Sequence, residues 1–383
     1  MSGWTLVSGD FVPTGGMDRA NLAFADWLLR QGEPVTVVSH RVDEGLTARP
    51  NLHFLRIPKP ANAYLLGAPL LAAAGLAQSA LRARTGGRVL VNGGNCPAAA
   101  DLNWVHYVHA AWTPRGREPG VRAAKRMASH ALSLRTERLA LSRARCVVAN
   151  SEATARVLVD AGLAPASRVR VVYYGADAAR FHPPSEAERA AGRAALGIPE
   201  GPPVMAFVGA LGDRRKGFDT LFDAWRARVR AGGWDARLVA MGAGAELEAW
   251  RARARAEGME DSVHLLGFRP DVPLLLAGCD GLVSPTRYEA YGLGVQEALC
   301  CALPTLVSAS AGVAERYPQG LRGLLLEDPD SSEELSDALR RWRDGRAGMA
   351  AALRDFSATL CARTWDHMAE ELYGAAGARP ASA

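Results

Sequence analysis

Short runs of β-branched residues recur along this chain, and most are followed by a glycine and then by a helical pattern. Residues 4–8 (WTLVS) and 34–39 (PVTVVS) enclose a Gly15–Gly16 turn and a segment with apolar residues at helical spacing. This order of strand, glycine loop, helix and strand forms a βαβ unit, whose strands are parallel. Further strand candidates lie at residues 52–57, 88–92, 146–149, 169–173, 204–209, 237–242, 262–267, 281–286 and 304–308. The sequence therefore predicts an α/β fold with open parallel sheets and helices on both faces.

One break in this pattern divides the chain. Residues 181–203 are polar and proline-rich, and the strand and helix pattern restarts directly after them. A chain of 383 residues is also too long for one ordinary core. We therefore expect two Rossmann-like domains, residues 1–180 and 181–361. A C-terminal segment, residues 362–383, follows as one more helix that Gly374 ends.

The net charge of +5 conceals an asymmetry between the two halves of the chain. Residues 1–180 hold 22 Lys and Arg against 12 Asp and Glu, whereas residues 181–383 hold 23 against 28. A basic half suggests an anionic partner, such as a membrane surface, a phosphorylated substrate or nucleic acid. An arginine-rich composition with solvated side chains is the alternative. Nucleic acid is not expected, because aromatic and basic residues are not interleaved in any known binding pattern.

The cysteines and the apolar segments indicate the cellular compartment of the protein. No basic and then apolar leader opens the sequence, and the six cysteines show neither CxxC pairs nor metal-ligand spacing. These features predict reduced thiols in a cytoplasmic protein. The most apolar stretch, residues 61–80, contains Asn62, Pro69 and Gln78. It predicts a buried core helix rather than a membrane span.

A cluster of cations follows the first strand of the second domain. Ligands of open α/β sheets bind beyond the carboxyl ends of the strands, where residues 209–217 (GALGDRRKG) lie. Lys216 as a point charge and Arg215 as a fork suit a diphosphate, although a solvated basic turn is the alternative. Further along, Gly292 to Gly294 open a helix, and backbone amides at a helix N-terminus attract phosphate.

Two glutamates flank this glycine segment in residues 284–304 (SPTRYEAYGLGVQEALCCALP). If phosphates occupy the helix N-terminus, the nearby carboxylates must face hydroxyl groups. Glu297, expected in the first turn of the helix, would bind a ribose, and Glu289 would bind hydroxyls of a transferred sugar. The alternatives are pairing of Glu297 with the helix dipole and solvation of Glu289.

Two histidines and three aromatic residues lie close together in residues 101–112 (DLNWVHYVHAAW) of the first domain. Sugar-binding sites favour such side chains. A strand would place His106 within the sheet and His109 at or just after its end. A core histidine is the alternative for both.

Taken in order, these segments resemble the retaining glycosyltransferases of family 4, which have the two-Rossmann GT-B fold. The resemblance covers nearly the whole chain. It rests on Gly15–Gly16, VHAAW with His109, residues 147–159, residues 171–183 with Tyr174 where the family usually has Asn, the phosphate loop of residues 207–225, and the E-x7-E signature of Glu289 and Glu297.

The resemblance implies a nucleotide-diphosphate sugar, UDP- or GDP-linked, bound between the domains and held mainly by the second. The final helix would cross back to the first domain. The implied donor contacts are Lys216 with the backbone of Gly292, Leu293 and Gly294 on the diphosphate, Glu297 on the ribose, Glu289 and His109 on the donor sugar, Gly16 near the phosphates, and Phe268 and Arg269 near the base. Glu289, His109 and Lys216 are thus the candidate catalytic residues.

One departure from the family concerns charge. Many members carry Arg directly after the strand glycine, where this chain has Ala210, and we expect Arg215 to supply that charge. No convincing DxD metal site occurs, since Asp328-Pro-Asp330 is typical of a turn. We therefore expect no cofactor. The resemblance implies transfer with retention, and because no second carboxylate of the first domain stands out as a nucleophile, we favour same-face attack by the acceptor over a covalent intermediate. A nucleotide-sugar epimerase or a non-catalytic sugar-nucleotide binder on the same fold is the alternative.

Acceptor choice is expected in the first domain. Residues 114–145 hold nine Lys and Arg against two Glu and are helical in pattern. A peripheral face on the inner side of an anionic membrane would suit a lipid-linked sugar acceptor in glycan, polysaccharide or glycolipid assembly. An ordinary solvated helix with a soluble sugar acceptor is the alternative.

Overall fold

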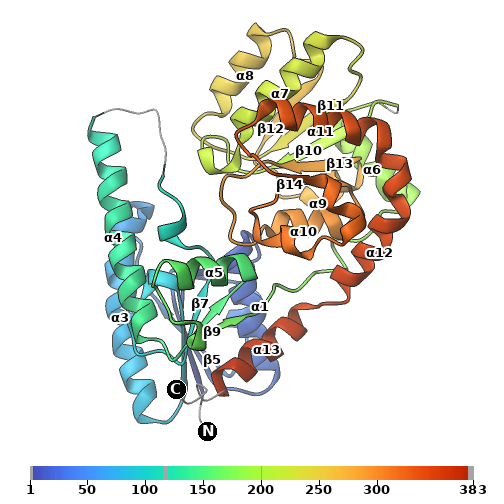
Figure 1. Cartoon of the computed structure of the whole chain (residues 1–383). Coiled ribbons are helices and arrows are strands. Elements are labelled where there is room, and N and C mark those ends of the chain that lie inside the picture. The colour runs from blue at the N-terminus through green and yellow to red at the C-terminus, as the bar shows by residue number, and fades with distance from the viewer. Residues whose placement is uncertain (1–2, 115–119, 200, 378–383) are drawn as a thin grey trace. The chain divides into compact units, whose positions relative to one another are not determined.

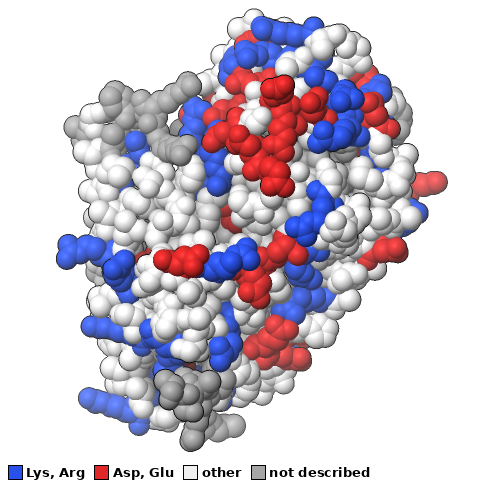
Figure 2. Space-filling view, in the orientation of Figure 1, with Lys and Arg blue, Asp and Glu red and all other residues white. Residues whose placement is uncertain are grey.

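The computed structural model describes residues 3–114, 120–199 and 201–377, which form two α/β units (Figure 1). Unit 1 comprises Met1–Gly175 and Arg363–Ala383, and unit 2 comprises Ala176–Ala362. The sequence placed the corresponding boundaries at residues 180 and 361. In the view of Figure 2, the largest group of Asp and Glu side chains lies over unit 2.

Unit 1 contains a seven-stranded parallel sheet in the order β5-β3-β1-β6-β7-β8-β9. In chain order its strands are β1 (Trp4–Val7), β3 (Val35–Ser39), β5 (Leu52–Arg56), β6 (Arg88–Asn92), β7 (Leu102–Val105), β8 (Cys146–Ala149) and β9 (Val169–Val171), with a small β2 (Asp10–Phe11) and β4 (Arg41–Val42) pair beside them. Its helices are α1 (Gly16–Arg30), α2 (Glu44–Thr47), α3 (Tyr64–Arg84), α4 (Val121–Arg143), α5 (Glu152–Asp160) and α13 (Trp365–Gly377), with 3₁₀ turns η1 (Pro60–Asn62), η2 (Gly93–Asn95), η3 (His109–Ala111) and η4 (Ala166–Arg168).

Unit 2 contains a six-stranded parallel sheet in the order β12-β11-β10-β13-β14-β15. Its strands are β10 (Val204–Val208), β11 (Arg237–Met241), β12 (Val263–Gly267), β13 (Gly281–Ser284), β14 (Thr305–Ser308) and β15 (Leu325–Leu326). Its helices are α6 (Glu186–Leu196), α7 (Phe218–Ala231), α8 (Leu247–Ala256), α9 (Val272–Ala277), α10 (Leu293–Cys300), α11 (Ser332–Gly345) and α12 (Ala350–Cys361), with 3₁₀ turns η5 (Arg214–Lys216), η6 (Gly312–Arg316), η7 (Gln319–Leu324) and η8 (Arg346–Met349). The predicted parallel sheets are confirmed, whereas the two-residue strand β15 was not predicted.

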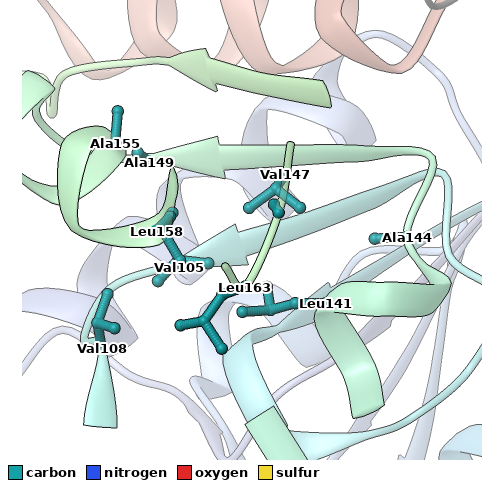
Figure 3. Close-up of a cluster of buried hydrophobic side chains, with 10 residues drawn as sticks. Val105, Val108, Leu141, Ala144, Val147, Ala149, Ala155, Leu158 and Leu163 are labelled. Carbon is teal, nitrogen blue, oxygen red and sulfur yellow. The ribbon is translucent and has the colours of Figure 1, made fainter. Parts of the chain in front are cut away.

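A buried aliphatic cluster fixes the part of unit 1 from which His109 projects (Figure 3). Val105 at the end of β7 and Val108 just after it pack with Leu141 of α4 and Leu158 of α5, and all four side chains are fully buried. Burying four such side chains contributes about 2 kcal/mol each. The backbone entering η3 is therefore anchored by core packing immediately before His109.

The C-terminal helix α13 packs against α1 of unit 1. Arg30 pairs in bidentate fashion with Asp366, at 2.9 and 2.6 Å, and the ring of Tyr373 packs at a tilt beside the rings of Trp4 and Trp27. The helix continues through Gly374 to Gly377. The prediction that Gly374 ends it is therefore wrong, because one glycine does not break a helix whose apolar face is held by tertiary packing.

Helix α3 contains the apolar stretch that we predicted to be a buried core helix. It packs against β1, β3 and β6, but only 22% of its most apolar 18-residue stretch is buried. By length and composition Leu65–Arg84 could cross a membrane. The prediction of burial is thus wrong for most of the helix, since hydropathy alone does not state how many sides of a helix are covered.

Both sheets reverse their strand order beside their first strand. In unit 2, β10 pairs with β11 on one side and with β13 on the other. The loops that follow β10 and β13 therefore leave the same edge of the sheet on neighbouring strands. Ligands of such folds bind at this reversal point.

Candidate functional site

The loop after β10 is pressed against the loop after β13. Gly217 has φ +70°, and a Cβ there would lie 1.9 Å from the carbonyl oxygen of Pro285, so only glycine fits. The Thr286 hydroxyl donates to the carbonyl of Arg215 at 2.9 Å. Asp213 caps the η5 turn by accepting from the Arg215 amide at 3.0 Å. These contacts fix the turn that carries the cationic cluster.

Two cations and one carboxylate meet where the two loops touch. Lys216 Nζ lies 2.5 Å from Glu289 Oε2, and Arg215 Nη1 lies 3.3 Å from the same oxygen. The three side chains are 16–21% exposed, so water screens them only in part. Burial raises the pKa of Glu289, but Lys216 and Arg215 outweigh it, and this pKa lies below its usual value. Glu289 is therefore an ionised, cation-bound carboxylate at neutral pH.

The N-terminus of α10 lies in the same loop as Glu289. Gly292 caps it with φ +104° and no side-chain hydrogen bond, and the amides of Val295 and Gln296 donate to Gly292 O. The amides of Leu293 and Gly294 lie ahead of any carbonyl of the helix and are free to bind an anion. A Cβ placed on Gly294 meets no atom within 4 Å, so the helix end is open on that side.

Glu297 lies deeper in α10 than we predicted. It is the fifth residue of the helix and half-buried, and no acidic residue occupies the first turn. Glu297 would lie in the first turn only if the second glycine, Gly294, capped the helix, whereas the first one, Gly292, is the cap. This position also weakens the alternative that Glu297 mainly neutralises the helix dipole, since that effect is confined to the first turn.

Arg287 joins the two loops and was not singled out by the sequence. Its guanidinium contacts Asp219 Oδ1 at 2.9 Å, Asp330 Oδ1 at 2.5 Å and the carbonyl oxygen of Arg214. Its side chain is only 11% exposed. Because Asp219 is 68 residues away in the sequence, no local pattern could have identified the pair. Arg287 is thus a positioning residue for the turn that carries Arg215 and Lys216.

We expect Arg287→Met to lower the free energy of unfolding by about 2 kcal/mol, because the half-buried Asp219 keeps only Arg214 as its cation and the carbonyl of Arg214 loses its donor. The loops should also loosen, so the affinity for an anionic ligand at Lys216 should fall. Urea denaturation and a binding titration measure the two effects. Arg340→Met is the matched control, because its ion pair with Asp337 is long, at 3.8 Å, and exposed. Equal stability of the two variants would contradict the role of Arg287.

Phe268 and Arg269 follow β12 at the same edge of the sheet of unit 2. Phe268 is 68% exposed, which is unusual for an aromatic ring without a ligand. Arg269 already directs its fork to Asp271, at 2.8 and 2.5 Å. Of this pair, Phe268 is the one that offers a free surface.

In unit 1, Gly16 is the first residue of α1 and follows Gly15, which has φ +82°. Asp18 lies within the first turn of this helix. Burial and the nearby Asp10 raise the pKa of Asp18 to about 6. No sequence pattern singles out this carboxyl group, since its environment depends on tertiary contacts.

His106 directly follows β7 and is half-buried, and its ring is engaged by neighbouring side chains. Its Nδ1 lies 2.5 Å from the hydroxyl of Tyr174, and the two rings are stacked. Burial lowers the pKa of His106 to about 3. Asn150 donates to the same hydroxyl at 3.2 Å. Tyr174 therefore completes a buried polar cluster at the position where the family pattern usually has Asn.

His109 lies in η3, half-buried and held through its backbone. Its amide donates to Glu137 Oε1 at 2.9 Å, and the amide of Ala110 donates to Glu137 Oε2 at 3.4 Å. Burial and the neighbouring His130 lower the pKa of His109 to about 4. His109 is therefore neutral at pH 7 and can donate one ring hydrogen bond. Glu137 is fully buried on α4 and was missed by the sequence, where it reads as one acid in a basic helix.

A cavity of about 490 Å³ opens beside His109. Helix α4 supplies one wall through residues at helical spacing. The lining residues are Tyr107, His109, Pro114, Lys125, Arg126, Ser129, His130 and Ser133. It combines cations, hydroxyl groups and imidazoles, which suits a polar ligand that carries negative charge. Within the described ranges, no group of three or more His, Cys, Asp or Glu side chains is placed to hold a metal ion.

Comparison with known proteins extends these observations. Residues 14–180 match the family model described as Glycosyltransferase Family 4, and residues 202–344 match Glycosyl transferases group 1. The D-inositol 3-phosphate glycosyltransferase of Stackebrandtia nassauensis is 30% identical over 244 residues, which are 60% of this chain and 53% of that protein. The 2-deoxystreptamine N-acetyl-D-glucosaminyltransferase of Streptomyces fradiae is 27% identical over 249 residues, 62% of this chain and 58% of that protein. The chain thus spans about half the length of the curated relatives it matches.

Solved structures share the whole fold at low sequence identity. WaaG, a glycosyltransferase involved in lipopolysaccharide biosynthesis, superposes with a TM-score of 0.75 at 20% identity and covers 96% of this chain and 98% of its own. Anabaena HepE in complex with UDP-glucose gives 0.71 at 18% identity, covering 98% and 99%. At these identities the similarity concerns the fold.

Proposed function

Because the chain belongs to the group 1 glycosyltransferases and has their GT-B fold, we propose that it transfers a sugar from a UDP- or GDP-linked donor to a hydroxyl acceptor. The observation that carries this proposal is the cluster of Lys216, Arg215 and Glu289 beside the open N-terminus of α10. This edge combines donors for phosphate with a carboxylate for sugar hydroxyls. Few ligands other than a nucleotide sugar need both within one site.

In the proposed complex, cations and carboxylate divide the donor between them. Lys216 has three N–H donors, and only one is needed for Glu289, so the others can bind diphosphate oxygens. The amides of Leu293 and Gly294 bind the same group. Glu289 and Glu297 accept hydrogen bonds from the donor sugar and the ribose. Phe268 offers its exposed ring to the base.

The catalytic step follows from the charge that develops on the leaving group. As the bond from the anomeric carbon to the diphosphate breaks, the sugar becomes oxocarbenium-like and the diphosphate gains negative charge. Fixed cations and amides aimed at that charge lower the barrier. The acceptor hydroxyl attacks the anomeric carbon, and its proton passes to a leaving phosphate oxygen. No external acid or metal is needed for this balance.

Retention through same-face attack is supported by the state of Glu289. A carboxylate held by two cations has its charge compensated, so it is a poor nucleophile and disfavours a covalent glycosyl-enzyme. His109 is neutral at pH 7, so it can donate a hydrogen bond to a sugar hydroxyl without adding positive charge. The anomeric configuration of the product, measured by NMR, should equal that of the donor. Inversion would contradict the mechanism.

Metal independence is part of the proposal, because Arg215 and Lys216 supply the positive charge that a metal ion would otherwise provide. Activity should survive excess EDTA, and its loss would contradict this point. We place the reaction in the cytoplasm, where nucleotide sugars are the available donors. A peripheral location at the inner membrane face would bring the enzyme to a lipid-linked acceptor.

The acceptor is assigned to the cavity beside His109. Lys125 and Arg126 line it, so a sugar or lipid-linked sugar that bears a phosphate or carboxylate fits its charge. A curated relative is named for D-inositol 3-phosphate, which has this chemistry. Assembly of a glycan, polysaccharide or glycolipid is the corresponding process.

A thermal-shift panel of nucleotide sugars tests the donor proposal. A donor present at about 100 times its Kd adds about 2.7 kcal/mol to the free energy of unfolding, which raises Tm by several degrees. The best donor is then incubated with phosphorylated and neutral sugars, and the products are analysed by mass spectrometry. A donor that binds but is only epimerised, or is recovered unchanged with every acceptor, would overturn the transferase proposal.

A further inference from the structure

Exposed large hydrophobic side chains are concentrated on two helices of unit 1. In the described part of the chain, only Val159, Phe268 and Leu274 lie elsewhere. The others are Leu65, Leu66, Leu70, Leu76 and Leu81 on α3 and Met127, Leu132 and Leu139 on α4. Scattered single exposures are normal, whereas such a concentration marks an interaction surface.

The outer face of α3 is apolar over almost its whole length. Leu66 and Leu81, near its two ends, are 53% and 55% exposed, and no charged residue lies between them. The opposite face carries Leu71, Gly75 and Ser79, which are buried at the spacing of one helix face. Because the inner face already packs on the sheet, the outer leucines do not stabilise the fold of unit 1.

This helix cannot cross a membrane while unit 1 is folded. It connects β5 to β6, and both strands belong to the same parallel sheet, with β3 and β1 between them. Its contacts with β1, β3 and β6 hold it flat against that sheet. A helix that exposes one apolar face while the other is fixed to a domain can only lie along an interface.

Helix α4 adds positive charge beside this apolar face. Its exposed side carries Arg135, Arg138 and Arg143 among its apolar residues. The single acidic residue among its described side chains, Glu137, is fully buried on the opposite side. Both α3 and α4 contact the η2 turn, and they run next to each other in Figure 1. Figure 2 shows Lys and Arg among uncharged residues along this edge of unit 1.

We infer that the outer faces of α3 and α4 form a docking surface for an anionic lipid bilayer. The α3 leucines insert among the acyl chains near the headgroups, and the arginines of α4 pair with lipid phosphates. A second copy of this chain fits less well. A symmetric contact through this surface would bring the arginines of both copies together without an acid on either side.

Docking would also orient the cavity beside His109. Lys125, Ser129 and Ser133 line that cavity at a spacing of four residues, so they occupy one face of α4. Arg135 and Leu139 occupy the face that contacts lipid. A bilayer on one side of α4 thus lies within one helix diameter, about 10 Å, of the acceptor cavity. The inference itself does not depend on the proposed transferase activity.

Flotation with vesicles tests the docking surface. The protein should bind phosphatidylcholine vesicles containing about 30 mol% phosphatidylglycerol, and should bind pure phosphatidylcholine at least about fivefold more weakly. The double variant Leu66→Glu/Leu70→Glu should reduce binding to the anionic vesicles by about thirtyfold or more, because two leucines that insert among the acyl chains become charged. Val159→Glu on α5 is the matched control and should bind as the wild type does.

Arg135→Glu/Arg138→Glu is a second variant that alters only exposed charges. It should lower binding to anionic vesicles at least about tenfold, as should about 0.5 M salt acting on the wild type, and Arg156→Glu on α5 is its control. Unchanged binding in both double variants would overturn the inference. A dimer in lipid-free solution that Leu66→Glu/Leu70→Glu dissociates would also overturn it, in favour of a second copy. The nucleotide-sugar thermal shift should be equal in all variants, so failure of docking and failure of the transferase proposal are distinguishable.

Discussion

Lys216→Ala is expected to reduce kcat/KM toward a nucleotide sugar by about a hundredfold or more while the protein remains folded. Lys216 Nζ is the cation nearest to Glu289, at 2.5 Å, and it stands beside the open amides of α10. Removing one contact to a leaving group that gains charge costs about 3 kcal/mol, which is about a hundredfold in rate. Steady-state kinetics with the donor found by thermal shift measures the effect.

Arg215→Ala should weaken donor binding about tenfold, because we propose that Arg215, 3.3 Å from Glu289 Oε2, supplies the charge missing at Ala210. Arg214→Lys is the matched control. It keeps a cation next to Asp219 and Glu246, 2.9 and 3.3 Å from the Arg214 guanidinium, and does not touch Glu289. If Arg215→Ala left donor affinity unchanged while Lys216→Ala abolished it, the compensating role of Arg215 would be wrong.

A double-mutant cycle separates the two tasks of the cluster. Lys216→Met alone leaves Glu289 with one cation. Part of the loss in kcat/KM would therefore reflect the carboxylate rather than the lost phosphate contact. Glu289→Gln removes that charge. If Lys216 acts only by holding Glu289, Lys216→Met should change kcat/KM little in the Glu289→Gln background. We expect most of the loss in kcat/KM to persist there, because the main partner of Lys216 in the transition state is the diphosphate.

The sequence predicted features that depend on local pattern. Parallel strands, the cationic turn and the glycine-capped helix all follow from residue type and spacing over short windows. Glu297 was placed in the first turn of α10 although it directly follows that turn, because the pattern does not show which of Gly292 and Gly294 caps the helix. The two histidines near residue 106 could not be separated either, since only packing shows that Tyr174 engages His106 and leaves His109 beside a cavity.

The features that the sequence missed depend on contacts between distant segments. Arg287 reads as an ordinary loop cation until Asp219 and Asp330 surround it. Glu137 reads as one solvated acid of a basic helix until the amides of η3 point at it. For α3, hydropathy indicates an apolar helix but not which of its faces the sheet covers.

After Lys216→Ala, we expect Glu137→Ala to have the largest effect, and it should lower both stability and activity. The change removes a fully buried carboxylate and leaves two backbone amides without their acceptor. The cavity and the unpaired amides should together lower the free energy of unfolding by about 2–4 kcal/mol. Displacement of His109 should lower kcat about tenfold or more.

The pH dependence of stability distinguishes Glu137 from an ordinary core residue. Burial raises the pKa of Glu137 from its ordinary value to about 7, against the opposing effect of the two amides. The folded state therefore binds a proton that the unfolded state releases. This contribution to stability is present in full below about pH 4.5 and is lost as the pH rises to about 7, by up to about 3 kcal/mol.

Glu137→Gln removes this titration while keeping one acceptor oxygen for the His109 amide. Relative to the wild type, its free energy of unfolding should change less between pH 5 and 7.5, as urea denaturation at several pH values would show. Glu152→Gln, an exposed glutamate on α5, should keep the wild-type slope. The kcat of Glu137→Gln should exceed that of Glu137→Ala, because the glutamine side chain still positions η3. Identical pH slopes in the wild type and Glu137→Gln would mean that Glu137 is ionised throughout this range, and that its charge directly supports the backbone of His109.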